Sequence, residues 1–244
     1  MSDSLLNIQI RHRIGAIALD IGFSLTKPWT VLFGPSGSGK TTVLRSIAGF
    51  VQPDEGRILY RGTPLFDASQ KHSIPAHLRP VRSAGQTAKL FPHMTVLKNI
   101  LYGSDRNAKS TDELDIANKI LASFQVDGHS SRMPSDLSGG EAQRVSAART
   151  LVSAITSADP AKPLLLLDEP FSGLDIATRD TITVRLKHWA SQYEIPVLSV
   201  THDLGEAFQL GEEIIKIGNG RIVQQGPPSE VLAEERARLL NQLR

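Results

Sequence analysis

A glycine-rich loop holds the residues whose types and spacing most clearly suggest chemistry. The run Gly34-Pro-Ser-Gly-Ser-Gly-Lys40-Thr41 fits G-x-x-x-x-G-K-[ST], a loop that surrounds phosphate groups with backbone amides. Glycine accepts dihedrals that other residues avoid, and a following helix start adds partial positive charge. Lys40 can reach the β- and γ-phosphates, and the Thr41 hydroxyl can ligate Mg²⁺. The residues predicted to bind a nucleoside triphosphate here are Gly34, Pro35, Ser36, Gly37, Ser38, Gly39, Lys40, Thr41 and Thr42.

Two acidic residues after an apolar run form a second candidate. Residues 164–167 are all leucine and lie between Pro163 and Asp168, which is typical of a fully buried parallel strand. Such a strand places Asp168 at the carboxyl edge of the sheet, where it can hold Mg²⁺ beside the phosphate loop. Glu169 is expected to polarise a water for attack on the γ-phosphate. A simple acidic helix start is the competing interpretation, and the phosphate loop upstream argues against it.

The elements that must position these residues follow from hydrophobic spacing. Residues 29–33 form an apolar strand before the loop, and apolar positions at 43, 44, 47 and 48 predict the helix after it. Half-buried strands are expected within residues 5–25 and at 57–61, so antiparallel strands precede and follow the loop. Further strands are predicted at 197–200, 214–217 and 221–224, the last two joined by a hairpin turn at Gly218-Asn-Gly220. The predicted helices cover residues 113–124, about 138–152, about 182–193, and about 229 onward.

This order predicts an α/β fold with a P-loop NTPase core, in which a mostly parallel sheet is flanked by helices. An antiparallel β subdomain at the N-terminus and an α-helical subdomain inserted at about residues 88–158 complete it. We expect residues 1–244 to form a single nucleotide-binding domain without a C-terminal regulatory domain.

Composition narrows the class of protein. The 244 residues carry a net charge of +2, which argues against bulk electrostatic binding to nucleic acid or lipid. The sequence has no cysteine, which excludes disulfides and thiolate metal sites. The apolar runs are far too short to span a membrane, and the N-terminus lacks the regions of a signal peptide. A cytosolic location is therefore expected.

A third segment, Leu137-Ser-Gly-Gly-Glu141, narrows the family. A serine and two glycines at a helix start make another anion site, from a hydroxyl, bare amides and the helix dipole. The chain here resembles the ATP-binding cassette (ABC) family, whose signature is LSGG followed by Q or E. The family order is phosphate loop, glutamine loop, signature, acidic strand, D-loop and switch histidine, and all six occur here in that order. The resemblance implies that ATP lies between the phosphate loop of one copy and Ser138, Gly139 and Gly140 of a second.

The resemblance assigns further residues. Gln86, before Leu90-Phe-Pro-His-Met-Thr-Val96, looks like the glutamine loop, which implies contact with Mg²⁺ and water and coupling to a transmembrane partner. Asp175 matches the D-loop, which crosses the dimer interface in the family, and His202 matches the histidine that contacts the γ-phosphate. The implied catalytic residues are Glu169, His202, Lys40 and Gln86. The implied Mg²⁺ ligands are Thr41, Gln86 and Asp168.

One departure concerns the base. Importers of this family usually carry an aromatic residue that stacks on adenine upstream of the loop, whereas residues 10–14 read Ile-Arg-His-Arg-Ile. His12 is the candidate to stack instead. No chemistry is assigned to His72, His77, His129 or His188, and His93 is expected on a partner-facing loop.

The implied function is ATP hydrolysis, with ATP and Mg²⁺, that energises solute import. The implied partners are transmembrane permease subunits, a second copy in a head-to-tail homodimer and a solute-binding protein, with no nucleic acid. The chain would attach to the inner face of the plasma membrane through the permease. Three features of the chain look most like the molybdate branch of the family: its shortened form, the glutamate in LSGGE and the absent adenine-stacking aromatic residue. Sulfate-like anions or others stay open as the transported solute. A non-transport ABC ATPase of the DNA-repair or translation type is the alternative, although these usually carry two cassettes or a long coiled coil. A phosphoryl-transfer kinase is a third class, which the signature argues against.

Overall fold

The computed structural model describes residues 4–15, 17–104, 111–158 and 162–242. The chain divides into two compact units. The first unit contains Met1–Val81 and Leu198–Arg244, and the second contains Arg82–Val197. The polar run at residues 104–112, whose composition predicts a loop before the helix at 113–124, lies largely outside the described residues.

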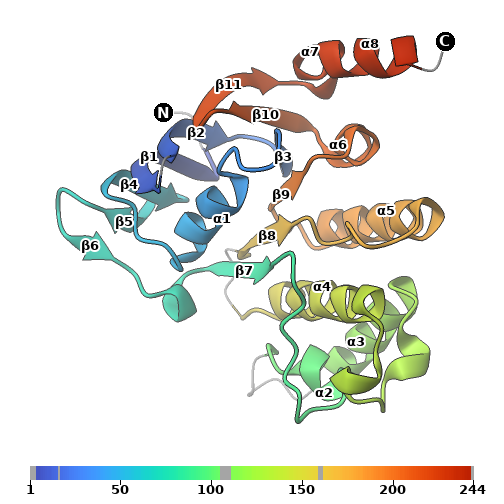
Figure 1. The fold of residues 1–244 in the computed structure, drawn as a ribbon. Helices are drawn as coiled ribbons and strands as arrows, with labels where there is room; N and C mark the ends of the chain where they lie inside the picture. Colours follow the sequence, from blue (N-terminus) through green and yellow to red (C-terminus); the bar gives the residue numbers. More distant parts are fainter. Residues whose placement is uncertain (1–3, 16, 105–110, 159–161, 243–244) are drawn as a thin grey trace. The chain divides into compact units, whose positions relative to one another are not determined.

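The first unit is built on strands, arranged in the order β6-β5-β4-β1-β2-β11-β10-β3-β9. β1 pairs antiparallel with both β2 and β4, whereas β10 pairs parallel with β3 (Figure 1). The bounds are β1 Leu6–Ile14, β2 Ile17–Leu25, β3 Trp29–Phe33, β4 Glu55–Tyr60, β5 Thr63–Asp67, β6 His72–Ser73, β9 Val197–Thr201, β10 Glu213–Gly218 and β11 Arg221–Gly226. The antiparallel strands before and after the phosphate loop are therefore confirmed.

Local sequence explains these strands. In β2, Leu19, Ile21 and Phe23 are buried while the residues between them are exposed, which is the predicted alternation of a strand with one solvated face. The β10–β11 hairpin turns at Asn219 and Gly220, whose φ angles of 48° and 74° are both left-handed. Asparagine and glycine tolerate this conformation, which matches the twist of the strands on either side.

The described residues of the first unit contain the 3-10 helix Ala76–Leu78 and four α-helices, α1 Lys40–Ala48, α6 Leu204–Leu210, α7 Pro228–Val231 and α8 Ala233–Gln242. A buried arginine, Arg79, supports the end of α1, because its guanidinium donates to the carbonyls of Ser46 and Ile47, each at 2.8 Å. Burial lowers the pKa of this arginine.

The helix predicted from about residue 229 is two helices in the structure. They are α7 and α8, and the break between them is at the fully buried Leu232.

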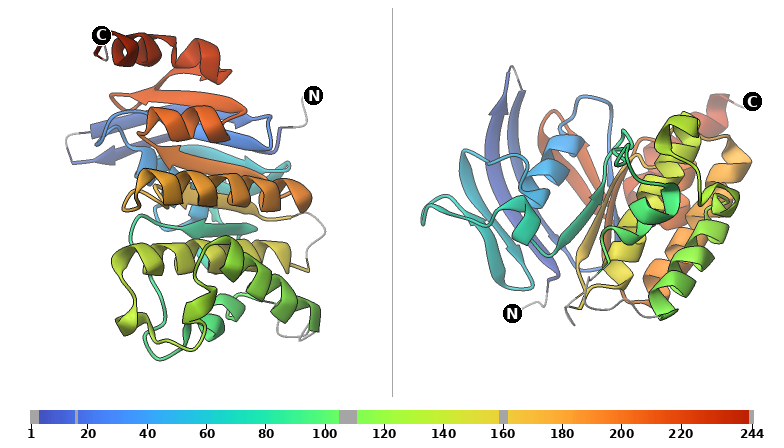
Figure 2. Two further views of the ribbon diagram at one scale, coloured as in Figure 1. Left: turned by 90° about the vertical axis from the view of Figure 1, so that its right-hand side faces the viewer. Right: turned by 90° about the horizontal axis from the view of Figure 1, so that it is seen from below.

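The second unit holds most of the helical mass. Strands β7 Val81–Ala84 and β8 Leu164–Asp168 are neighbours, and the helices are α2 Val96–Leu101, α3 Thr111–Ser123, α4 Gly139–Ile155 and α5 Ile176–Gln192. Helices α2, α3 and α4 pack against one another (Figure 2). Trp189 of α5 donates to the Ser123 hydroxyl of α3 at 3.1 Å, which links these two helices. The inserted helices confirm the predicted fold class, whereas the boundary of the single domain stays a prediction.

The segment before α2 is irregular, although the region from about residue 88 was predicted to be helical. Asn99, which is fully buried, holds it in place. The Asn99 side chain accepts from the Phe91 amide at 2.8 Å and donates to the carbonyls of Phe91, Met94 and Thr95. His93 is exposed on this loop, and its contact with a partner stays a prediction. Among the described residues, no helix has both the length and the apolar character needed to cross a membrane.

Candidate nucleotide site

The glycines of the phosphate loop are required by space as well as by dihedral angle. A Cβ at Gly34 would lie 2.2 Å from the Ile217 carbonyl oxygen. Gly39 has φ of 103°, and a Cβ there would lie 2.3 Å from the Leu19 side chain. Gly37 is also left-handed, with φ of 79°. A loop that turns this tightly between β3 and α1 keeps side chains away from the space where its amides gather.

The polar groups of the loop suit an anion. Lys40 is 6% exposed, and its Nζ donates to the carbonyls of Gly34 at 2.8 Å and Pro35 at 3.0 Å. The Ser38 hydroxyl is buried and has no hydrogen-bond partner among the described residues. Pro35, Ser36, Gly37 and Thr41 are exposed, and Thr42 is half-buried.

Helix α1 begins without a side-chain cap and without an acidic residue in its first turn. Its first amides are therefore left for another partner, and the positive end of its dipole is not offset. These features together fit the triphosphate predicted from the sequence motif.

In the second unit, the structure brings together Gln86 and Glu169. The Gln86 side-chain amide donates to a Glu169 carboxylate oxygen at 3.4 Å, and Gln143 of α4 donates to the Gln86 carbonyl at 3.0 Å. Asp168 ends β8 and is 8% exposed, so it lies at the strand terminus as predicted.

Glu169 has a backbone conformation that no sequence pattern predicted. Its φ of 47° lies in the left-handed region, which is unfavourable for a residue with a β-carbon. Such strain persists where the surroundings fix it and is concentrated at functional sites. The chain therefore leaves the extended conformation directly after Asp168, at Glu169.

The signature segment forms a closed cap at the start of α4. The Ser138 hydroxyl accepts from the Glu141 amide at 3.3 Å, and a Glu141 carboxylate oxygen accepts from the Ser138 amide at 2.7 Å. This is a capping box, which satisfies two helix-end amides reciprocally. The hydrogen bond from the Ser138 amide is the main cause that lowers the pKa of Glu141 from 4.5 to about 2.

His129, to which no sequence motif assigned a role, contacts this cap. Its Nε2 lies 2.9 Å from the second carboxylate oxygen of Glu141. Both side chains are mostly buried, with 19% and 23% of their surface exposed. The contact depends on the chain path between these residues, so no local motif could have revealed it.

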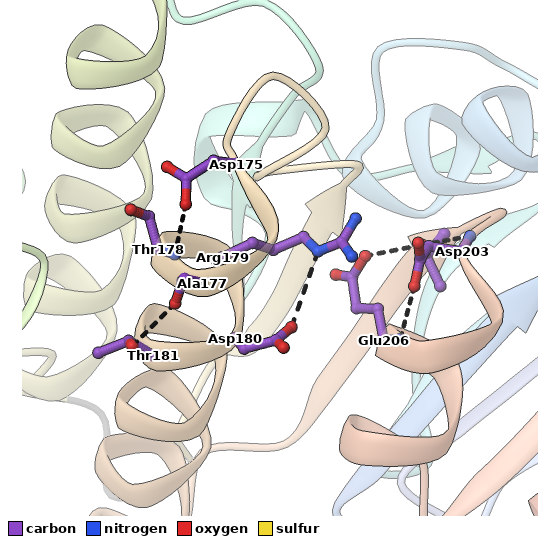
Figure 3. A network of polar contacts seen from close by, with 9 residues as sticks. Asp175, Ala177, Thr178, Arg179, Asp180, Thr181, Asp203 and Glu206 are labelled. Atoms are coloured by element: carbon purple, nitrogen blue, oxygen red, sulfur yellow. Dashed lines mark hydrogen bonds and ion pairs between the residues drawn. The ribbon is translucent and has the colours of Figure 1, made fainter.

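The D-loop segment Ser172-Gly-Leu-Asp175 lies against the signature helix α4 within the second unit. A Cβ at Gly140 would lie 2.9 Å from the Leu174 side chain, and one at Gly173 would lie 3.1 Å from Gln143 Oε1. Asp175 caps α5 by accepting from the Thr178 amide at 3.0 Å (Figure 3). That hydrogen bond keeps the pKa of Asp175 below its ordinary value.

In the first unit, His202 is exposed between β9 and α6. The residues around it close a ring of hydrogen bonds, shown in Figure 3. The Thr201 hydroxyl donates to Glu206 at 2.7 Å and accepts from the Asp203 amide at 3.0 Å, while Asp203 accepts from the Glu206 amide at 2.8 Å. The ring fixes the backbone on both sides of His202.

His12, the candidate for adenine stacking, lies near the end of β1. Its Nδ1 lies 3.1 Å from the Asp54 carboxylate, which also accepts from the Arg13 amide at 2.9 Å. This backbone hydrogen bond is the main cause that lowers the pKa of Asp54. The imidazole is thus held at one edge by Asp54, and 18% of the side-chain surface is exposed.

Comparison with known proteins places these motifs in one family. A profile described as "ABC transporter" matches residues 20–172. The molybdenum import ATP-binding protein ModC of Brucella melitensis is 37% identical over 230 residues, which are 93% of this chain and 60% of that protein. The chain thus spans about three-fifths of the length of this relative. The molybdate/tungstate import ATP-binding protein WtpC of Archaeoglobus fulgidus is 35% identical over 233 residues, 93% of this chain and 89% of that protein.

A solved structure shares the fold. The structure of cbiO1 from Clostridium perfringens, described as part of the ABC transporter complex cbiONQ, superposes with a TM-score of 0.77 at 24% identity. The superposition covers 99% of this chain and 96% of that chain. Since the profile matches more than half of the sequence and the relatives align with nearly all of it, the chain belongs to the ABC transporter family.

Proposed function

We propose that the chain is the ATP-hydrolysing subunit of a membrane importer. The observation that carries this is the uncapped helix start after the phosphate loop together with the signature segment at Ser138, in a single chain of the ABC transporter family. The relatives named as import ATP-binding proteins support the direction of transport.

ATP would bind first to the phosphate loop. The amides of Gly37 and Gly39 and the buried Ser38 hydroxyl are the donors, and the Lys40 ammonium exchanges loop carbonyls for phosphate oxygens. Ser138, Gly139 and Gly140 of a second copy would close on the same ATP, which requires a head-to-tail homodimer. Asp175 would lie at that interface.

The residues also fit Mg²⁺. Thr41, Gln86 and Asp168 offer hydroxyl, amide and carboxylate oxygens, the hard ligands that Mg²⁺ prefers. The ion, when bound, neutralises charge on the phosphate oxygens. Thr41 is exposed at the start of α1 and Asp168 ends β8, so both oxygens come from rigid elements.

Hydrolysis would then depend on a positioned water. Glu169 accepts a proton from that water as it attacks the γ-phosphate, and Gln86, 3.4 Å from Glu169, orients the carboxylate. His202, held between Thr201 and Asp203, donates to the γ-phosphate. Lys40 and the signature amides offset the negative charge that builds up on the transferred group.

The solute class is the finest part of the proposal. Relatives named for molybdenum or molybdate/tungstate import support a tetrahedral oxyanion such as molybdate. A transmembrane permease and a solute-binding protein would complete the assembly, and the permease would hold this chain at the inner face of the plasma membrane.

Two measurements test the function. Purified chain with ATP and Mg²⁺ should release free phosphate, and Lys40→Ala should not. Phosphate transferred to an acceptor instead would indicate a kinase. Vesicles that contain the permease and this chain should take up radioactive molybdate with ATP, in preference to sulfate. Hydrolysis that is indifferent to every permease tested would favour a non-transport ATPase.

A further inference from the structure

Three residues form a chain of contacts beneath the signature segment. His129 Nε2 lies 2.9 Å from Glu141 Oε1, and Glu141 Oε2 accepts from the Ser138 amide at 2.7 Å. A carboxylate only accepts hydrogen bonds, so the imidazole proton resides on Nε2. Both oxygens of Glu141 are therefore engaged, one by a side chain from outside the helix and one by the helix start.

The Glu141 side chain fixes the backbone that carries the Ser138 hydroxyl. Its carboxylate accepts from the Ser138 amide, while the hydroxyl oxygen accepts from the backbone amide of Glu141. The hydroxyl is therefore held by the helix backbone, and the Glu141 carboxylate holds the residue from which the hydroxyl projects. If the carboxylate left the cap, the Ser138 amide would lose its partner, and an unpaired negative charge would lie beside the proposed anion site.

His129 stands on a fixed support. It ends a short 3-10 turn, Asp127–His129, and its carbonyl accepts from the Arg132 amide at 2.9 Å. The next residue, Ser130, accepts at its carbonyl from the Leu97 amide of α2 at 3.0 Å. The imidazole therefore approaches Glu141 from a segment tied to another helix.

We propose that His129 is a positioning residue for ATP hydrolysis, which holds the Glu141 carboxylate against the Ser138 amide and so keeps the signature serine in place for ATP. It acts through Glu141 and does not touch ATP. The inference rests on the proposed function, because it assumes that the signature segment binds ATP on a second copy. It predicts a defect in turnover without a defect in the binding of ATP to the phosphate loop, which lies in the other unit.

A pair of substitutions separates the hydrogen bond from the volume. His129→Leu keeps the bulk and removes the donor, whereas the side-chain amide of His129→Gln can replace Nε2–H. In the full chain, His129→Leu should lower kcat on the order of tenfold, as expected for a lost charge-assisted hydrogen bond. KM and the equilibrium binding of ATP should stay within about twofold, since each depends on the loop. His129→Gln should recover most of kcat, and His188→Ala, at an exposed histidine of α5, should match wild type.

A double-mutant cycle tests whether His129 acts through Glu141. In a Glu141→Ala background, His129→Leu should cause no further loss, because the group that His129 positions is gone. A fully additive loss, or equal losses for His129→Leu and His129→Gln, would show that the histidine only fills space. Thermal unfolding of each variant identifies a loss of folding.

The result also separates this inference from the proposed function. Wild-type hydrolysis together with normal turnover in His129→Leu would overturn the role of His129 alone. A wild-type chain that does not hydrolyse ATP would overturn both.

Discussion

The two helix starts that we propose to meet at ATP differ in how their own polar groups are satisfied. Helix α1 has a glycine before it, no side-chain cap and no acid in its first turn. Helix α4 has a reciprocal cap between Ser138 and Glu141, a negative charge in its first turn and a histidine behind that charge. One start is open and the other is closed on itself.

This difference suggests a division of labour. Open amides and a dipole without a counter-charge favour anion binding, so α1 should supply most of the affinity for a triphosphate. The closed start of α4 gains less from an anion. The amides of Ser138 and Glu141 are already hydrogen-bonded, and the Glu141 carboxylate places a negative charge in the first turn. Its contribution is geometric, and it should matter when a second copy brings ATP against a hydroxyl that is already oriented.

The largest expected effect comes from a substitution at the open helix start, that of α1. Lys40→Ala removes the ammonium that now donates to the carbonyls of Gly34 and Pro35. We expect hydrolysis to fall on the order of a thousandfold, since a positioned charge at the transferred group is lost. Phosphate release measured with circular dichroism as a folding control would check it, and wild-type turnover in this variant would refute the assignment of the loop.

The next effect tests whether the two starts share one ATP. Glu169→Gln keeps the shape of the side chain and removes the proton acceptor, so hydrolysis should fall roughly a hundredfold or more. ATP would then persist between two copies. Size-exclusion chromatography with ATP and Mg²⁺ should show a dimer for Glu169→Gln and mainly monomer for wild type. The same experiment with Ser138→Ala added should weaken the dimer, and a dimer of unchanged stability would exclude the signature from the contact.

A smaller effect concerns the charge at the closed side. The pKa of Glu141 is about 2 in the folded chain, below its ordinary 4.5, so its contribution to stability is complete above pH 4.5. That contribution is lost as the pH falls toward 2, because the protonated acid no longer suits the Ser138 amide. Thermal unfolding at pH 7 and pH 3 should therefore differ less in Glu141→Gln than in wild type, by about 2–4 °C. Glu234→Gln, at an exposed glutamate of α8, should keep the wild-type difference.

The outcome of the sequence predictions follows from how local each signal is. The phosphate loop, β8 and the β10–β11 hairpin carry their cause within a few residues, so glycine spacing, an aliphatic run and an Asn-Gly turn were enough. Residues 64–84 gave no clear pattern, because β5, β6 and β7 are short and three prolines, Pro64, Pro75 and Pro80, interrupt the segment. Helix α6 has seven residues, too few for a helical period to stand out.

The site shows the same limit. Motif spacing was sufficient to select Lys40, Asp168 and Ser138 as candidates. The left-handed backbone of Glu169 and the contact of His129 with Glu141 arise from the folded chain path. Neither the Glu169 conformation nor the His129–Glu141 contact can be predicted from the order of residue types, so both became visible only in the folded structure.

The smallest expected effect concerns the base, which lies beyond both helix starts. With no aromatic residue at the expected place, adenine loses a stacking contact worth ~1–3 kcal/mol. The triphosphate would then dominate the binding energy, so we expect ATP and GTP to differ by less than about tenfold, equivalent to ~1.4 kcal/mol. The competing view is that His12, whose ring is held at one edge by Asp54, stacks on the base. Competition binding of ATP and GTP to wild type, His12→Ala and the matched Asp54→Asn separates the cases. A strong ATP preference that disappears in His12→Ala would assign stacking to this histidine, with a partial loss in Asp54→Asn as the orienting carboxylate is removed. A strong preference that survives both substitutions would mean that another residue reads the base.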